Sequence, residues 1–170
     1  TNHASVIQRN YGDATVVTPY YPDADDSIYP FPVLRYPSID VTKLVGYRAG
    51  LPLSPELMAQ VEGRHIDLIH SHCPVTSTIL ARMRQRLHVP LVFTYHTKFD
   101  IDIANAIHSK RLQEASIGLL VENISACDEV WTVSRGAGEN LRSLGYQGDY
   151  IVMPTRPRTG GGRARGLPGL

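Results

Sequence analysis

The sequence predicts an α/β fold in which helices flank a parallel β-sheet. Between residues 12 and 154, short apolar segments alternate with longer segments of helical periodicity, which is typical of successive β-α-β units. The apolar segments are rich in valine, isoleucine and aromatic residues, as expected of strands covered on both faces. With 170 residues, 42% hydrophobic and 19% charged, the chain is long enough for one domain with a buried core.

Six apolar segments are predicted to form the strands. They are residues 14–18, 33–36, 66–71, 91–95, 129–133 and 150–153. The segment PDADDS, which begins at Pro22 between the first two strands, lacks the spacing of a calcium-binding loop. We expect it to be a mobile surface segment.

The first predicted helix follows Ser54. Ser54, Pro55 and Glu56 supply an N-cap, a proline at the first helical position and an early acid, all of which favour a helix start. Gly63 is expected to end this helix in a left-handed conformation.

Three further helices are predicted from periodicity and capping signals. One begins near Pro74 and carries an apolar stripe of four residues: Val75, Ile79, Met83 and Leu87. Another spans residues 107–126 and is expected to direct four apolar residues toward the sheet: Leu112, Leu119, Leu120 and Ile124. The last spans residues 135–144, with Ser134 as its N-cap and Gly145 as its end.

Several classes of protein are disfavoured by composition. No segment approaches the roughly 18 consecutive apolar residues that span a membrane, and the first residues lack the apolar centre of a signal peptide, so we expect a cytoplasmic protein. Cys73 and Cys127 lack a Cys-x-x-Cys spacing and are predicted to be reduced thiols.

The end of the chain differs from the rest. Residues 155–170 contain five glycines, four arginines, two prolines and no acid, so they are predicted to form a disordered, non-native tail after a domain of residues 1–154. The alternative is a basic arm for an anionic surface. The preceding residues include thirteen basic and sixteen acidic ones, a balance that does not favour nucleic-acid binding.

Polar motifs follow three of the predicted strands: HSHCP, YHTKFD and VSRG. Ligands of open parallel sheets bind beyond the carboxyl ends of the strands, so a site is expected there. His70 and His72 lie two residues apart and face the same side of a continuing strand. They could hold a metal together with His96 or Asp100. Alternatively, one histidine packs against backbone and the other contacts a ligand.

His96 and Ser134 each have two readings. The imidazole of His96 either bonds a ligand or caps its own loop. Ser134 either caps its helix or helps the helix amides to hold a phosphate. The basic residues of the predicted helices are expected to form a solvated face. They are Arg82, Arg84, Arg86, Lys110 and Arg111. The alternative is docking on anionic lipid, which would need a broader apolar face than residues 75–87 offer.

Eight segments, taken in order, resemble the N-terminal half of glycosyltransferase family 4. They are VVTPYYPD, RYPS, GYRAGLPLSPEL, DLIHSHCP, VPLVFTYHTKFD, ACDEVWTVS, LRSLGY and YIVMP. The resemblance covers about residues 12–154 and implies a Rossmann-like domain of a retaining GT-B enzyme. This domain receives a hydroxyl acceptor and faces a second domain that binds the nucleotide-sugar donor. No cofactor and no bound metal are implied.

The resemblance also implies roles for individual residues. His96 falls on the family's histidine that approaches the transferred sugar, which implies a catalytic role. Substrate-binding roles are implied for His72, near the acceptor, and for Ser134, which opens the helix after Val-Ser. Thr97, in the Tyr-His-Thr motif, is a further substrate-binding candidate. The His-x-His and Tyr-His-Thr strand ends look most like enzymes that glycosylate lipid acceptors, which would bring peripheral contact with the inner membrane face.

The sequence departs from the family at both ends. The family opens with a strand and a glycine-rich loop that precede the first segment found here, and it continues beyond Pro154 into a donor-binding domain. We therefore expect a part of a hexosyltransferase that is inactive on its own. The alternative is a truncated domain that at most binds acceptor. A third hypothesis is a small metal-dependent hydrolase built on His70, His72 and His96.

Overall fold

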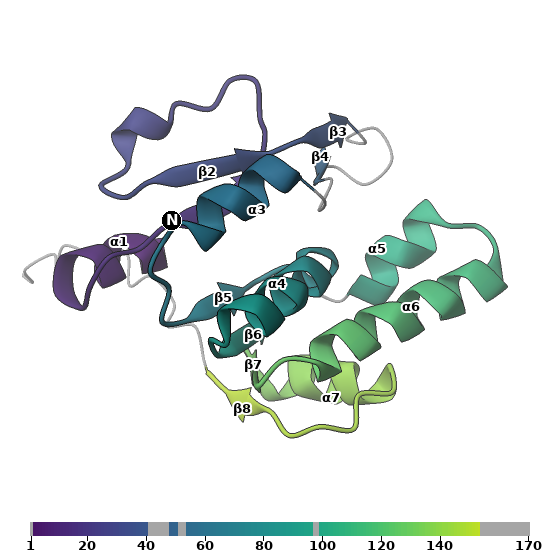
Figure 1. The fold of residues 1–170 in the computed structure, drawn as a ribbon. Coiled ribbons are helices and arrows are strands. Elements are labelled where there is room, and N and C mark those ends of the chain that lie inside the picture. The colour runs from purple at the N-terminus through teal and green to yellow at the C-terminus, as the bar shows by residue number, and fades with distance from the viewer. Residues whose placement is uncertain (1, 41–47, 51–53, 97–98, 154–170) are drawn as a thin grey trace, which may run out of the picture.

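The computed structural model describes residues 2–40, 48–50, 54–96 and 99–153, and its α/β architecture (Figure 1) confirms the predicted fold class. The main sheet is parallel and contains four strands in chain order. They are β5 (Ile69–Ser71), β6 (Leu91–Tyr95), β7 (Glu129–Thr132) and β8 (Ile151–Val152). The predicted tail lies outside the described residues.

The other two predicted strands form a separate parallel pair, β1 (Val16–Pro19) and β2 (Val33–Tyr36). The sequence predicted a single sheet, and the structure differs from this prediction. Within the described ranges, no strand pairing joins β1 to β5. An antiparallel pair, β3 (Ser38–Asp40) and β4 (Arg48–Gly50), was not predicted. These strands have three residues each, too few to show an alternating pattern.

The helices follow the predicted order, with two additions. Those described are α1 (Asn2–Asn10), α3 (Pro55–Glu62), α4 (Pro74–Leu87), α5 (Phe99–Ala106), α6 (Lys110–Ser125) and α7 (Arg135–Ser143), with a short 3-10 turn, η1 (Asp26–Ile28). The sequence interpretation did not include α1 or α5. No helix in the described part of the chain is long and apolar enough to cross a membrane.

The capping predictions at Ser54 and Gly145 are confirmed, and the one at Gly63 is confirmed in its position only. The Ser54 hydroxyl accepts a hydrogen bond from the Leu57 amide at 3.2 Å, which fixes the start of α3. Gly145, just beyond α7, has the positive φ of 108° that favours glycine. Gly63 ends α3 as predicted, but its backbone is right-handed, with φ −74°, and not left-handed. The left-handed helix end occurs instead at His88, with φ 56° after α4.

The predicted apolar stripes are only partly buried. On α4, Ile79 and Met83 are buried, whereas Val75 is 53% exposed. On α6, Ile124 is buried, but Leu112 and Leu119 are 59% and 58% exposed. Leu120, one position after Leu119, is partly buried and lines a small cavity with Phe99 and Ile124, so the side of α6 that faces the core carries Leu120 and Ile124 rather than Leu119.

Two apolar clusters form the core. One joins β6, α6 and α7 through Phe93, Tyr95, Ile124 and Leu141. The other joins β2, α3 and α4 through Tyr36, Leu57, Val61, Ile79 and Met83, and Figure 1 shows α3 between β2 and α4. Every residue of β6 is buried, so the strand that precedes His96 is firmly held.

Two of the three arginines of α4, Arg84 and Arg86, form ion pairs, although the sequence had suggested that the basic residues of this helix are only solvated. Arg84 forms an ion pair with Asp128 at 3.2 Å and donates to the Ala126 carbonyl. Arg86 pairs with Glu62 of α3 at 3.0 Å. Asp128 also accepts from the Leu91 amide at 2.7 Å. These contacts attach α4 to its neighbours and fix the beginning of β6.

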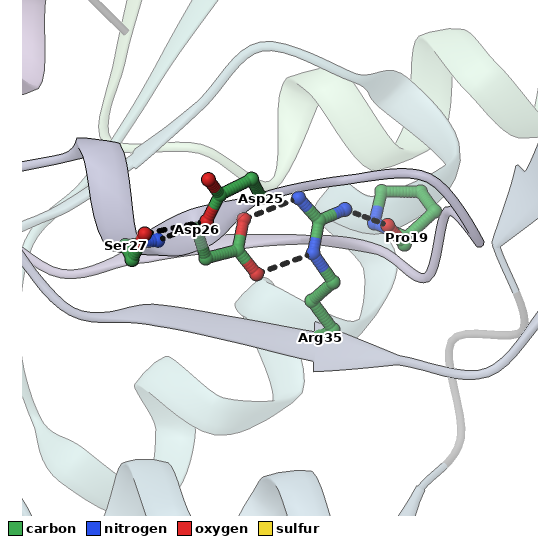
Figure 2. Close-up of polar contacts among 5 residues, drawn as sticks. All are labelled: Pro19, Asp25, Asp26, Ser27 and Arg35. Carbon is green, nitrogen blue, oxygen red and sulfur yellow. Dashed lines mark hydrogen bonds and ion pairs between the residues drawn. The ribbon is translucent and has the colours of Figure 1, made fainter.

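The acidic segment that begins at Pro22 is held in place, which corrects the expectation of a mobile loop. Figure 2 shows Arg35 of β2 donating to both carboxylate oxygens of Asp26, at 2.6 and 2.8 Å, and to the Pro19 carbonyl at 2.8 Å. Asp25 caps η1 by accepting from the amide and the hydroxyl of Ser27. A bidentate guanidinium pair has a defined geometry, so this segment is attached to the β1–β2 pair.

Candidate functional site

Three histidines meet at the carboxyl ends of β5 and β6. His70 lies in β5, His72 follows that strand, and His96 follows β6. The two strands pair in parallel, with Ser71 opposite Phe93, so their ends lie at the same edge of the sheet. We call His70, His72 and His96 the histidine cluster; the sequence predicted that they would share this edge.

The rings of the cluster are in contact. Nδ1 of His72 lies 2.9 Å from Nε2 of His96, a hydrogen-bond distance. The rings of His70 and His72 are 4.3 Å apart, centre to centre, with an angle of 35° between their planes. His72 is therefore placed between the other two imidazoles.

His70 is the packed member of the cluster. Its Nε2 lies 2.7 Å from Oγ1 of Thr94, and its ring meets the ring of Trp131 edge-on at 5.1 Å. Thr94 is buried and pairs with Trp131 in the register of β6 and β7. This agrees with the expectation that one histidine of the pair is packed, although its partners are two side chains rather than the backbone.

Sequence reasoning missed Thr94, Trp131 and His3 as members of this region. The signal for Thr94 was its spacing, because it lies two residues before His96 and alternate strand residues share a face. Trp131 required the register between β6 and β7, which only the structure supplies. His3 belongs to α1, a helix that the sequence interpretation did not include.

The cluster favours neutral imidazoles. Burial lowers the pKa of His72 to about 4, and repulsion from His70 and His96 adds to this effect. The pKa of His70 and that of His96 are also lowered, first by burial and then by the nearby charge of His3. A neutral imidazole offers one donor and one acceptor nitrogen, the pair of functions that a hydroxyl group can use.

The arrangement does not resemble the proposed metal site. In the part of the chain that the structure describes, no group of three or more His, Cys, Asp or Glu side chains is placed to hold a metal ion. The His72 and His96 nitrogens that face each other are joined by a hydrogen bond. Asp100, the other suggested ligand, lines a small apolar cavity with Tyr95 and Phe99.

Ser134 and Thr97 complete the predicted site residues. Ser134 follows β7 at the same edge of the sheet, and its hydroxyl accepts from the Ala137 amide at 3.1 Å. The N-cap interpretation is thus confirmed, and the first turn of α7 begins at this edge. Thr97 lies outside the described residues, so its role stays a prediction.

A parallel α/β domain with convergent polar side chains at the carboxyl edge of its sheet belongs to the class that binds ligands there. The model of glycosyltransferase family 4 matches residues 2–155. The chain therefore belongs to glycosyltransferase family 4, as the eight sequence segments predicted. The match includes α1, which lies before the first of those segments. A search of curated proteins finds no match.

Proposed function

We propose that this domain forms the acceptor side of a hexosyltransferase that uses a nucleotide-sugar donor and a hydroxyl acceptor, with retention of configuration. The single observation that supports this most strongly is the histidine cluster at the carboxyl edge of a family 4 domain. Family membership implies donor and acceptor substrates in general. The His-x-His and Tyr-His-Thr strand ends support a lipid hydroxyl as the acceptor.

In this proposal, His96 bonds a hydroxyl of the transferred sugar. Its neutral imidazole needs no counter-ion, and it follows a strand that is buried throughout. Only contacts that are stronger in the transition state than in the bound substrate accelerate transfer. A His96 side chain held rigidly in position therefore contributes more to the rate than one that merely binds the substrate tightly. The protein contributes positioning and charge stabilisation rather than a covalent step of its own.

The remaining candidates are assigned to the acceptor and to the donor phosphates. His72 is on the acceptor side, Thr97 follows the catalytic histidine, and Ser134 lies where the first turn of α7 can approach the donor phosphates. Backbone amides at a helix N-terminus favour anions, which supports this place for the diphosphate. The donor itself is held mainly by a second domain across the cleft.

The test is a transfer assay with a polypeptide that joins this domain to a donor-binding domain of the family. Radiolabelled UDP-glucose and GDP-mannose serve as donors, and a diacylglycerol and a soluble alkyl glycoside serve as acceptors. We expect a product whose anomeric configuration equals that of the donor, with the lipid preferred. A product of inverted configuration contradicts the proposal, and acceptor binding without transfer from either donor favours a truncated, inactive domain.

A further inference from the structure

The hydrogen bond between His72 and His96 restricts the proton positions of both rings. It joins Nδ1 of His72 to Nε2 of His96 at 2.9 Å. A hydrogen bond between two imidazole nitrogens requires one of them to carry a proton and the other to lack one. The tautomers of the two rings are thus coupled, and Nδ1 is the nitrogen of His96 that remains for a ligand.

His72 is supported on the side away from His96. Its ring packs against His70 at 4.3 Å, and His70 is fixed by Thr94 and Trp131. The chain on both sides of His72 is also held, because Ser71 and Pro74 are buried. The His72 ring is therefore supported, directly or through His70, by residues of three strands: β5, β6 and β7.

We propose that His72 is a positioning residue for His96. The bond fixes the orientation of the His96 ring, couples its tautomer to that of His72, and leaves the other ring nitrogen, Nδ1, to bond a sugar hydroxyl. This inference rests on the proposed function for its consequence in transfer, but the bond itself can be tested without any reaction. Among the residues that the structure describes, the titratable groups that act on the pair are His3 of α1 and His70 of β5.

The experiment uses the 170-residue chain with ¹⁵N-labelled histidine. In the unmodified protein at pH 7.5, we expect an NMR coupling between Nδ1 of His72 and Nε2 of His96 across the hydrogen bond. We also expect the ¹⁵N shifts of His96 to report one tautomer. This measurement needs no variant, so the proposal stays testable even where a substitution impairs folding.

Two substitutions at His72 make a matched pair. The amide of Asn places a donor and an acceptor near the position of Nδ1, whereas Leu has similar bulk and neither function. We expect His72→Leu to give a mixture of His96 tautomers and His72→Asn to restore a single one. Absence of the coupling, or a His96 tautomer that is the same in His72→Leu as in the unmodified chain, would overturn the proposal.

Transfer by the two-domain polypeptide separates this inference from the proposed function. His72→Leu should lower kcat about tenfold with little change in the acceptor KM, and His72→Asn should recover most of the loss. A rise in KM alone would show that His72 binds acceptor and does not position His96. If the unmodified polypeptide transfers no sugar while the NMR coupling is present, the proposed function fails and the positioning contact stands.

Discussion

At the scale of single residues, the histidine cluster combines close packing with lowered pKa values. His72 lies between two other imidazoles, so adding a proton to it meets both desolvation and repulsion. The bond to His96 also requires that the two facing nitrogens share a single proton. The arrangement is consequently suited to neutral pH and sensitive to acid.

The first prediction follows from this sensitivity. The pKa of His72 is about 4 in the folded chain and about 6.5 when unfolded, so the unfolded state binds more protons as pH falls below 6.5. The contribution of His72 to the free energy of unfolding should therefore be fully present above pH 6.5 and should be lost progressively as the pH falls toward 4. Urea unfolding at pH 7.5, 6.5 and 5.5 measures this decline, and His72→Leu should reduce it. An equal decline in both proteins would contradict the assigned pKa of His72.

The second prediction concerns Arg35 and Asp26. Replacing Asp26 with Asn removes the charge from a bidentate, partly buried pair and should lower the free energy of unfolding, because one oxygen that accepts from the guanidinium is replaced by an amide donor. Asp23→Asn, in the same segment but without a hydrogen bond or ion pair to another described residue, is the matched control and should change it by less than about 0.5 kcal/mol. Equal effects of the two substitutions in urea unfolding would show that the pair does not hold the segment.

At the scale of elements, α7 connects the site to the core. It begins at Ser134 beside the carboxyl end of β7, and its Leu141 is buried with Phe93 and Tyr95 of β6. The Tyr95 hydroxyl donates to Oδ1 of Asn140 at 2.6 Å. The helix that begins at the carboxyl edge of the sheet is therefore fixed to β6, the strand that precedes His96.

The third prediction compares two glycines of α7. A Cβ at Gly138 would lie 2.3 Å from ring atoms of Tyr150, whereas a Cβ at Gly136 would meet nothing within 4 Å. Gly138→Ala should destabilise the protein by about 1–3 kcal/mol through overpacking. Gly136→Ala should be neutral or stabilising by up to about 1 kcal/mol, because alanine favours helix. Thermal unfolding of the two variants decides this, and stabilisation by both would mean that Tyr150 does not pack closely on α7.

At the scale of the whole molecule, the sequence was informative wherever local rules decide the outcome. The short apolar segments located most strands, and the caps at Ser54 and Ser134 located two helix starts. The rule that ligands bind at the carboxyl ends of parallel strands predicted that the histidines lie together. The sequence could not show that Leu112 and Leu119 remain exposed, because burial depends on which helices pack against α6. The bond between His72 and His96 depends on side-chain orientation, which no pattern of residue types specifies.

The fourth prediction concerns donor affinity. We place most donor contacts in a second domain. The 170-residue chain should therefore bind UDP-glucose or GDP-mannose with a Kd no tighter than about 1 mM, because it lacks most of the contacts that would supply the roughly 8 kcal/mol of a micromolar Kd. Isothermal titration calorimetry of the chain measures this affinity. A micromolar Kd would instead identify this domain as the main donor site.

The central claim is that His96 contacts the transferred sugar, and the most direct measurement is turnover by the two-domain polypeptide with His96→Ala. Turnover should fall on the order of 10²-fold while donor affinity and melting temperature change little, because a contact made in the transition state is lost. His65→Ala, at an exposed histidine outside the cluster, should leave turnover unchanged. Normal turnover of His96→Ala with a lowered melting temperature would contradict the claim and identify His96 as a structural residue only.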